Sequence, residues 1–319
     1  MTLRLALLST ADINEKLAAG ARQADAVEIV AIGSRDATRA RRQAGDLNVP
    51  RALSSYEEVL EDPGVDAVYI ARPNSLHVEW SIRALEAGKL VLCEKPMSRH
   101  PAEVERAFDA ADAAGRVLAE AFMWRHTPQA HKLRELAGEL GEIRLVRAAF
   151  SFPLPVEENV RWAADLDGGA LMDVGCYCVS GARFLLGEPL EVTAASFGNG
   201  VDARMVATMR FDGGALAHFD CGFDLAFRDE LEVVSGSGTL FVDDPWHSRR
   251  TGIEVGDAGG ERTPVAVPEA DPYGCELDDF ARACAGEIEH PFGRADALGQ
   301  ARAIAALYEA ADSGRAVSL

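Results

Sequence analysis

The alternation of short apolar segments with amphipathic ones over the first 120 residues constrains this chain most. Apolar runs that predict buried strands lie at Leu3–Leu8, Val27–Gly33, Val65–Ala71, Leu90–Cys93 and Val117–Ala121. Helical periodicity fills the segments between them: Asn74 can cap one helix, and Gly88 and Gly115 stand where helices end. Short buried strands separated by helices indicate an α/β fold with a doubly wound parallel sheet, the Rossmann arrangement.

After Ala121 the pattern changes to longer strands that follow one another directly. Strands are predicted at 143–152, 190–197, 205–211, 215–221, 231–235 and 239–242, and helices at 128–137, 170–186, 273–285 and 294–311. Asp212-Gly213-Gly214 is typical of a hairpin turn. Such a run favours a mostly antiparallel open sheet. We therefore expect a Rossmann domain over residues 1–122 and an α+β domain over residues 123–319.

Composition narrows the function classes. Acidic residues outnumber basic ones by 51 to 32, which gives a net charge of −19 and disfavours binding to nucleic acid or an anionic membrane. No apolar run reaches the roughly 18–20 residues of a membrane span, and the N-terminus lacks a signal-peptide pattern. The six cysteines lie inside regular segments, so we expect reduced thiols, a cytoplasmic protein and no metal site.

The turn after the first strand differs from the dinucleotide-binding pattern G-x-G-x-x-G. Ser9 and Ala11 stand in place of the first two glycines, and both are small enough for a pyrophosphate to approach the backbone. Thr10 can donate a hydroxyl, and Asp12 and Ile13 open the helix. These five residues are candidate cofactor contacts, although an ordinary strand-to-helix turn would have the same appearance.

Gly33-Ser34-Arg35 ends the second strand, where an NAD site usually carries an acidic residue. A hydroxyl and a planar guanidinium suit a 2′-phosphate, so Ser34 and Arg35 favour NADP, with NAD still possible. The alternative is that Arg35 lies in a solvated turn near other arginines.

Two further motifs carry groups able to do chemistry. Cys93-Glu94-Lys95-Pro96 follows a buried strand, and Asp173 and Tyr177 are four residues apart in a predicted helix, where they face the same way. Each has an ordinary structural explanation by itself, since lysines occur beside sheet edges and aspartates in first helical turns.

Together these motifs point to a known family. Five motifs extend over nearly the whole chain: E-K-P, G-G-A-L-x-D-x-G-x-Y, A-R-P-N-S-L-H from Ala71, E-A-F-M-W-R-H from Glu120 and D-D-F-A-R-A from Asp278. The chain resembles the glucose–fructose oxidoreductase/inositol dehydrogenase (Gfo/Idh/MocA) family. Tyr177 stands where the inositol dehydrogenases carry histidine, which is similar to the glucose–fructose oxidoreductase, xylose dehydrogenase and dihydrodiol dehydrogenase branch.

The resemblance implies hydride transfer between a nicotinamide and a carbon of a sugar, cyclitol or related polyol. It implies that Lys95, Asp173 and Tyr177 are catalytic and contact the substrate, with a cis peptide bond between Lys95 and Pro96. Tyr177 would accept the proton, Lys95 would stabilise the phenolate, and Asp173 would orient the substrate or the lysine. Lys95 as the direct base is the alternative that the sequence leaves open.

Further contacts follow from the same resemblance. The implied cofactor contacts are Ala71, Pro73, Asn74, His77, Glu94, Lys95, Arg161 and Trp162. Arg125 is a candidate substrate residue, and Trp246 and His247 are expected at the pocket rim or a subunit contact. Arg72 stands where relatives usually carry an apolar residue, and it either touches cofactor or substrate or faces solvent.

Three functions are compatible with these features. The first is an NADP-dependent oxidoreductase acting on a sugar or polyol. The second is a ketoreductase acting on a nucleotide-linked or glycoside sugar, and the third is a non-catalytic dinucleotide sensor on the same fold. The sheet of the second domain should leave one face bare, so a homodimer or homotetramer is expected.

Overall fold

The computed structural model describes residues 2–155 and 159–319, and contacts between Cα atoms divide the chain into two compact units. The first unit comprises Met1–Met123 and Asp271–Leu298, and the second comprises Trp124–Ala270 and Gly299–Leu319. The change of unit after Met123 is next to the expected boundary. However, Asp271–Leu298 lies with the first unit, whereas we expected it in the second domain.

The first unit contains a six-stranded parallel sheet in the described part of the chain, ordered β3-β2-β1-β4-β5-β6. Its strands are β1 (Leu3–Leu7), β2 (Val27–Gly33), β3 (Ala52–Leu53), β4 (Ala67–Ile70), β5 (Leu90–Glu94) and β6 (Leu118–Ala121). Its helices include α1 (Ile13–Ala21), α2 (Ala37–Leu47), α3 (Tyr56–Glu61), α4 (His77–Glu86), α5 (Pro101–Ala114) and α8 (Pro272–Cys284). The doubly wound parallel sheet is therefore confirmed.

The start of α4 differs from the prediction. Asn74 begins a short 3₁₀ turn, Asn74–Leu76, and α4 starts only at His77. The residue before the turn is Pro73, whose carbonyl accepts from the Leu76 N–H at 2.9 Å. The polar residue expected to cap the helix thus opens the preceding turn.

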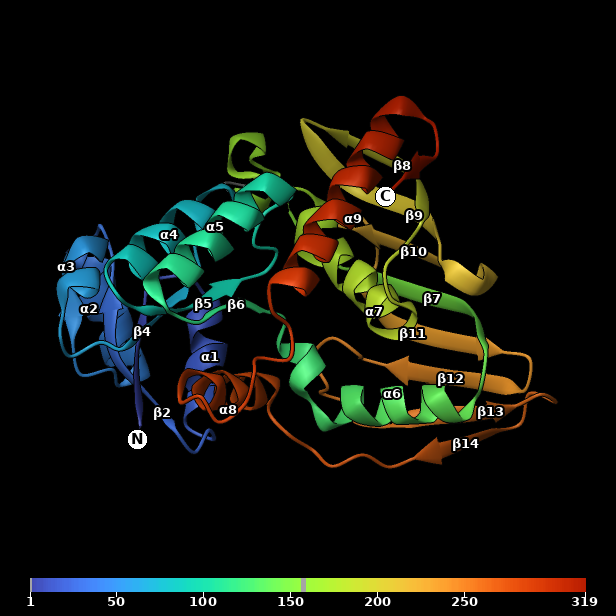
Figure 1. Ribbon diagram of the computed structural model, residues 1–319, viewed down its shortest axis with the longest axis horizontal. Helices are drawn as coiled ribbons and strands as arrows, with labels where there is room; N and C mark the ends of the chain where they lie inside the picture. Colours follow the sequence, from blue (N-terminus) through green and yellow to red (C-terminus); the bar gives the residue numbers. More distant parts are fainter. Residues whose placement is uncertain (1, 156–158) are drawn as a thin grey trace. The chain divides into compact units, whose positions relative to one another are not determined.

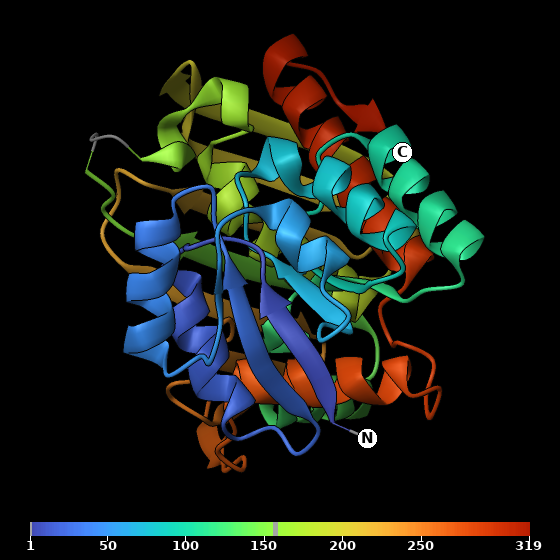
Figure 2. The same cartoon turned by 90° about the vertical axis from the view of Figure 1, so that its left-hand side faces the viewer.

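Helix α8 belongs to the first unit because it packs closely on α1. A Cβ atom at Gly20 of α1 would lie 2.6 Å from the Gly274 nitrogen, so the backbones approach more closely than a larger residue allows. The Asp25 N–H donates to Asp278 at 2.9 Å. The two helices lie side by side in Figures 1 and 2.

The second unit contains a nine-stranded sheet in its described part, ordered β14-β13-β12-β11-β7-β10-β9-β8-β15. Its strands are β7 (Ile143–Ser151), β8 (Glu191–Asn199), β9 (Val201–Arg210), β10 (Leu216–Gly222), β11 (Arg228–Ser235), β12 (Gly238–Asp243), β13 (Ile253–Asp257), β14 (Arg262–Val265) and β15 (Val317–Ser318). Among these strands only β7 and β10 pair in parallel. The mostly antiparallel sheet is confirmed.

Helices cover one face of this sheet. Figure 1 shows α6 (Pro128–Glu139), α7 (Cys176–Leu186) and the end of α9 (Arg294–Ser313) on that face. By length and composition the segment Ala164–Leu186, which ends in α7, would be able to span a membrane. Since 78% of its apolar window is buried inside the protein, it is typical of a core helix.

Candidate active site

The turn after β1 is held by side chains. The Ser9 hydroxyl accepts from the Ala11 N–H at 3.2 Å, and the Gln43 amide donates to the Ala11 carbonyl at 3.1 Å. Thr10 and Ile13 are half-buried. Asp12, the N-cap of α1, makes no side-chain cap hydrogen bond, so the start of this helix can still bind an anionic group. That this turn binds a pyrophosphate stays a prediction.

The end of β2 combines a buried hydroxyl with an exposed guanidinium. Ser34 is buried, and its hydroxyl accepts from the Asp36 N–H at 3.1 Å, whereas Arg35 is exposed. The Asp36 carboxylate caps α2 by accepting from the N–H groups of Thr38 and Arg39 at 2.8 and 3.1 Å. Both bonds use Oδ1 of Asp36, and the binding of a 2′-phosphate at this strand end stays a prediction.

The loop after β4 carries Ala71, Pro73, Asn74 and His77, of which His77 is completely buried. Its Nδ1 lies 2.9 Å from the carbonyl oxygen of Pro96, and its Nε2 lies 2.7 Å from that of Arg72. Burial lowers the pKa of His77 to about 4, although the two carbonyls act in the opposite direction. The ring therefore joins two loops, and its nitrogens are turned away from solvent.

The E-K-P loop after β5 is fixed at each of its residues. Glu94 accepts from the Tyr69 hydroxyl and, at 3.1 Å, from the Lys95 N–H. The Lys95–Pro96 peptide bond is cis, which confirms the implied geometry. The next N–H, that of Met97, donates to Glu120 at 2.6 Å. These bonds hold the backbone of Lys95 at the carboxyl edge of the sheet, where ligands of doubly wound folds bind.

In the second unit, a glycine pair sets the start of the helix that carries Asp173 and Tyr177. Gly169 has φ +123°, and its N–H donates to the Arg161 carbonyl at 2.9 Å. A Cβ atom there would overlap the Asp202 carboxylate, which accepts from the Leu171 N–H at 2.6 Å. Glycine at this position thus lets Asp202 anchor the first turn.

The two candidate catalytic side chains of this helix have different surroundings. Asp173 accepts from Arg161 Nε at 2.7 Å, and it is partly exposed. Tyr177 is buried, with the rings of Phe150 and Trp246 at centroid distances of 5.5 and 5.9 Å. Arg161 therefore pairs with a candidate catalytic residue in this structure, a contact that the sequence did not indicate.

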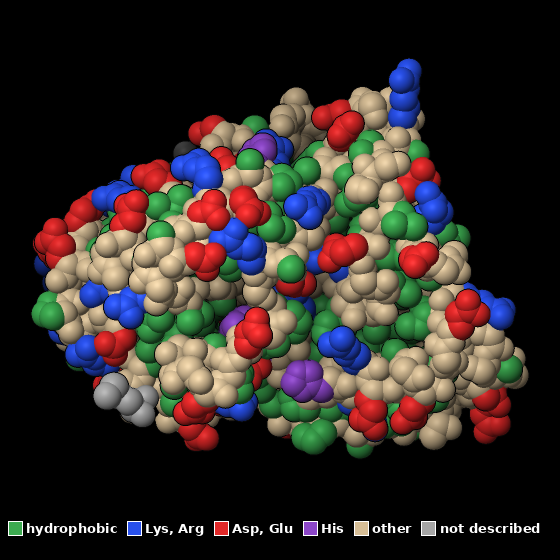
Figure 3. Space-filling model, viewed as in Figure 1, with side chains coloured by type: hydrophobic (Ala, Val, Ile, Leu, Met, Phe, Trp, Pro, Cys, Tyr) green, Lys and Arg blue, Asp and Glu red, His purple; other side chains and the backbone are tan. Residues whose placement is uncertain are grey.

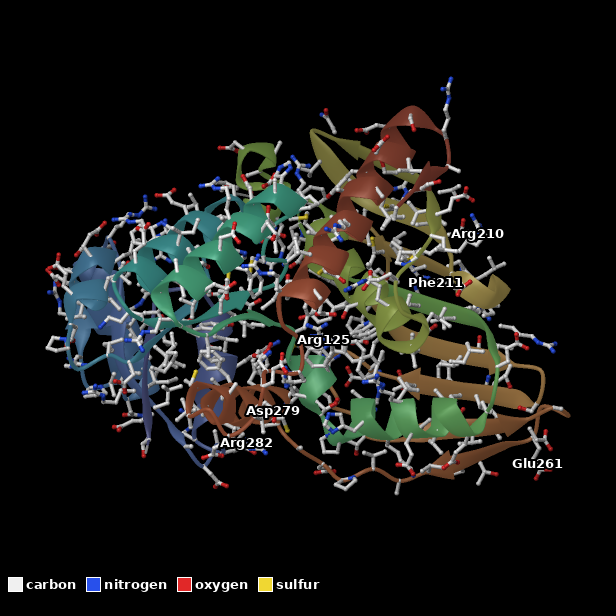
Figure 4. The ribbon with its side chains drawn as sticks, viewed as in Figure 1. Arg125, Arg210, Phe211, Glu261, Asp279 and Arg282 are labelled. Carbon is white, nitrogen blue, oxygen red and sulfur yellow. The ribbon has the colours of Figure 1, made fainter. Side chains whose placement is uncertain are left out.

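The two remaining candidates of this unit lie on short helical turns. Trp162 Nε1 donates to the Pro155 carbonyl at 3.1 Å, and its ring meets Phe223 edge-on at 5.2 Å. Arg125 is buried in the 3₁₀ turn Met123–His126, which precedes α6 (Figure 4). Their contacts with cofactor or substrate stay predictions.

The structure thus groups the candidates into two sets. The first unit carries the first turn, the ends of β2 and β4, and Lys95 of the E-K-P loop. The second unit carries Arg125, Arg161, Trp162, Asp173 and Tyr177. That Lys95 meets Asp173 and Tyr177 over a nicotinamide stays a prediction.

Sequence reasoning missed a polar cluster that contacts Phe150, the ring next to Tyr177. Nδ1 of His247 lies 3.0 Å from Asp229 and 3.6 Å from Asp244, and its ring contacts Phe150 edge-on at 5.5 Å. Arg249 pairs with both carboxylates. Asp229 lies on a distant strand, so no local pattern indicated the cluster.

The pKa values of the two carboxylates in this cluster shift in opposite directions. Burial raises the pKa of Asp229, whereas hydrogen bonds from His247 and Arg249 lower that of Asp244 despite its burial. The ligand atoms of Asp229, Asp244 and His247 lie within 4.8 Å of one another, a spacing that would be able to hold a metal ion. Arg249 already supplies positive charge to both carboxylates.

Trp246, expected at a pocket rim, is instead fully buried. A Cβ atom at Gly181 of α7 would lie 2.7 Å from the ring of Trp246.

On the face drawn in Figure 3, acidic and basic side chains are interspersed.

A doubly wound domain whose first helix begins at the carboxyl end of β1 is typical of dinucleotide-binding proteins. Residues 9–122 match an oxidoreductase family with an NAD-binding Rossmann fold, and residues 129–241 match the GFO/IDH/MocA C-terminal domain. The chain belongs to the GFO/IDH/MocA family of oxidoreductases.

Named relatives and solved structures match this chain over more than two thirds of its length. It is 38% identical to D-xylose 1-dehydrogenase (NADP(+)) 2 of Haloferax volcanii over 98% of both chains. It is 34% identical to mouse trans-1,2-dihydrobenzene-1,2-diol dehydrogenase, over 69% of this chain and 67% of that one. Aldose-aldose oxidoreductase from Caulobacter crescentus superposes with a TM-score of 0.91 at 27% identity over 100% of both chains. KijD10, a 3-ketoreductase from Actinomadura kijaniata in complex with NADP and TDP-benzene, gives 0.91 at 29% identity over 97% of this chain and 98% of that one.

Proposed function

We propose that the protein is an NADP-dependent oxidoreductase that transfers a hydride between the nicotinamide and a hydroxyl- or carbonyl-bearing carbon of a sugar, cyclitol or related polyol. The observation that carries this proposal is the similarity, over 98% of both chains, to an enzyme whose name specifies D-xylose and NADP. The buried hydroxyl of Ser34 and the exposed guanidinium of Arg35 support NADP over NAD.

Each candidate catalytic residue has a part in this proposal. NADP, when bound, supplies the hydride acceptor for oxidation or the hydride donor for reduction. Tyr177 accepts the hydroxyl proton in oxidation, and the ammonium of Lys95 stabilises the phenolate. Asp173 orients the substrate or the lysine, and Arg161 holds its carboxylate. Lys95 as the direct base remains the alternative.

The test is NADP reduction with a panel of aldoses and inositols, beginning with D-xylose. Tyr177→Phe and Lys95→Ala should each lower kcat by about 10²–10⁴, since a positioned acid–base group contributes that much. The affinity for NADP should change little in Tyr177→Phe. A protein that binds NADP but shows the same turnover in the wild type and both variants would instead be a dinucleotide sensor.

Cofactor preference has a separate test. Arg35→Ala should weaken NADP binding by about 10- to 100-fold, because a hydrogen bond to a charged group contributes roughly 1.5–3 kcal/mol. NAD binding should be almost unaffected. Equal losses for both cofactors would show that Arg35 does not contact the 2′-phosphate.

A second candidate function is the reduction of a nucleotide-linked keto sugar. Two observations favour it: the similarity in fold to a 3-ketoreductase solved with NADP and TDP-benzene, and 35% identity over 68% of this chain to a dTDP-sugar 3-reductase of Saccharopolyspora spinosa. NADPH oxidation with a dTDP-linked keto sugar, and none with free aldoses, would decide in its favour.

We also propose a homodimer or homotetramer and a cytoplasmic location. Along the sheet face opposite α6 and α7, β8 and β9 expose Phe197 and Val206 at 61% and 57%. Six free cysteines support a reducing compartment. Light scattering at micromolar concentration tests the first proposal, where a monomer would refute it, and cell fractionation tests the second.

A further inference from the structure

Arg72 is held rigidly at the carboxyl end of β4. Its guanidinium carbon lies 4.2 Å from the ring centroid of Tyr56 and 5.1 Å from that of Trp80. The two rings meet edge-on at 4.9 Å. Cation–π contact with two aromatic rings restricts where the guanidinium can lie. The side chain is therefore a fixed cation at the sheet edge where the cofactor is proposed to bind.

Arg35 lies near this cation because α3 approaches the end of β2. A Cβ atom at Gly33 would overlap Val59 of α3 and lie 3.2 Å from the carbonyl of Ser55, the residue before Tyr56. The Ser34 N–H also donates to the Leu53 carbonyl at 3.3 Å. In agreement, burial and then the charge of Arg35 lower the pKa of Arg72.

Glu57 and Glu79 act on Arg72 electrostatically, but neither lies within ion-pair distance of it. Within residues 2–155 and 159–319, neither Arg35 nor Arg72 takes part in an ion pair. The acidic neighbours Glu57 and Glu79 pair instead with Arg83, at 2.6 and 3.9 Å. Nε of Arg72 is buried without a hydrogen-bond partner.

Two neighbouring guanidinium groups that form no ion pair favour an anion between them. We propose that Arg72 acts together with Arg35 to bind the 2′-phosphate of NADP, so that two arginines from the ends of β2 and β4 determine the cofactor preference. This inference rests on the proposed use of NADP. It assigns a role to Arg72, for which the sequence left cofactor contact and solvent exposure both open, and the phosphate dianion would receive a guanidinium from each side.

The experiment compares the binding of adenosine 2′,5′-bisphosphate and 5′-AMP by calorimetry, since these two probes differ only in the 2′-phosphate. Arg72→Leu should weaken binding of the bisphosphate by about 10- to 100-fold and that of AMP by much less. Arg35→Ala should have a similar effect, and the double variant should lose most of the preference. Arg83→Leu is the matched control, because Arg83 stacks on the same Trp80 at 3.9 Å but already pairs with Glu57.

The outcomes separate this inference from the proposed function. If the wild type binds both probes equally, NADP preference fails, and the two-arginine site fails with it. If the wild type prefers the bisphosphate and Arg72→Leu keeps that preference in full, only the role of Arg72 is overturned, and its stacking is structural. Should Arg72→Leu not fold, Arg72→Gln decides in the same way, because its planar amide can still stack on Tyr56.

Discussion

At the scale of single residues, His77 is a titratable side chain that the fold keeps neutral. Its two nitrogens face two carbonyl oxygens, which would both accept hydrogen bonds from an imidazolium. Burial nevertheless lowers its pKa to about 4, with smaller contributions in the same direction from the charges of Lys95 and Arg72. The neutral ring carries a single N–H, so it donates to one of these two carbonyls and only contacts the other.

This shift makes stability depend on pH. Between about pH 6.5, where an unfolded histidine titrates, and about pH 4, the unfolded chain binds more protons at His77 than the folded chain does. The contribution of His77 to stability is therefore present above pH 6.5 and is lost as the pH falls to 4. Over the whole window the loss amounts to about 3 kcal/mol.

The measurement is urea unfolding of the wild type and His77→Gln from pH 7 to pH 4. The variant should be less stable at pH 7, because it loses contacts with the Arg72 and Pro96 carbonyls. The difference between the two proteins should shrink towards pH 4, since glutamine does not titrate. A difference that stays constant with pH would mean that His77 is protonated equally in both states.

Residues whose position follows from a short sequence motif could be predicted, whereas residues that only the folded chain brings to the site could not. Ser34, Lys95 and Asp173 stand in short motifs whose positions follow from the strand or helix beside them. Asp202, in contrast, anchors the helix of Asp173 from a strand that follows it in sequence. For Arg72 the sequence left contact with cofactor or substrate and exposure to solvent both open, because its partners Tyr56 and Trp80 come from two different helices.

At the scale of elements, the helix of Asp173 and Tyr177 depends on anchors outside itself. Asp202 accepts from the Leu171 N–H at 2.6 Å and from the Tyr308 hydroxyl at 2.9 Å. At the other end of the π-helical turn Leu171–Gly175, the Gln300 amide donates to the Cys176 carbonyl at 2.8 Å. These bonds satisfy backbone groups that an irregular helix leaves open.

Asp202→Ala should therefore destabilise the protein by about 2–4 kcal/mol, because a buried N–H and a hydroxyl lose their acceptor. Asp224→Ala is the control: Asp224 pairs with Arg204 at a partly exposed site, where an ion pair contributes about 0–1 kcal/mol. Urea unfolding monitored by circular dichroism measures both. Equal effects of the two substitutions would refute an anchoring role for Asp202.

The strands that the sequence did not predict are short or lie at sheet edges. The strand β13 reads Ile253-Glu254-Val255-Gly256-Asp257, in which glycine and two acidic residues weaken the strand pattern. The strand β14, beyond it, is exposed along most of its length and contains Pro264. Both form because β12 offers them a free edge, a tertiary effect that no local pattern carries.

At the scale of the whole chain, the first unit is completed by a segment from near the C-terminus. The chain leaves this unit after Met123 and returns for Asp271–Leu298. On that segment, Arg294 pairs with three carboxylates of α5 at 2.6 to 2.8 Å: Glu105, Asp109 and Asp112. The sequence boundary near residue 122 follows from the change of pattern, but a single helix that returns to α1 has no distinct composition to indicate it.

We therefore expect a fragment of residues 1–123 to lack a cooperative thermal transition, because α1 loses its close packing on α8 at Gly20. Joining residues 271–298 to the fragment through a Gly/Ser linker should restore the transition. Replacing Gly20 by leucine in this linked fragment should abolish it again, since no side chain fits against the Gly274 backbone. Circular dichroism and calorimetry measure the transition. Cooperative melting of residues 1–123 alone, at the temperature of the linked fragment, would show that α8 rests on a domain already complete without it.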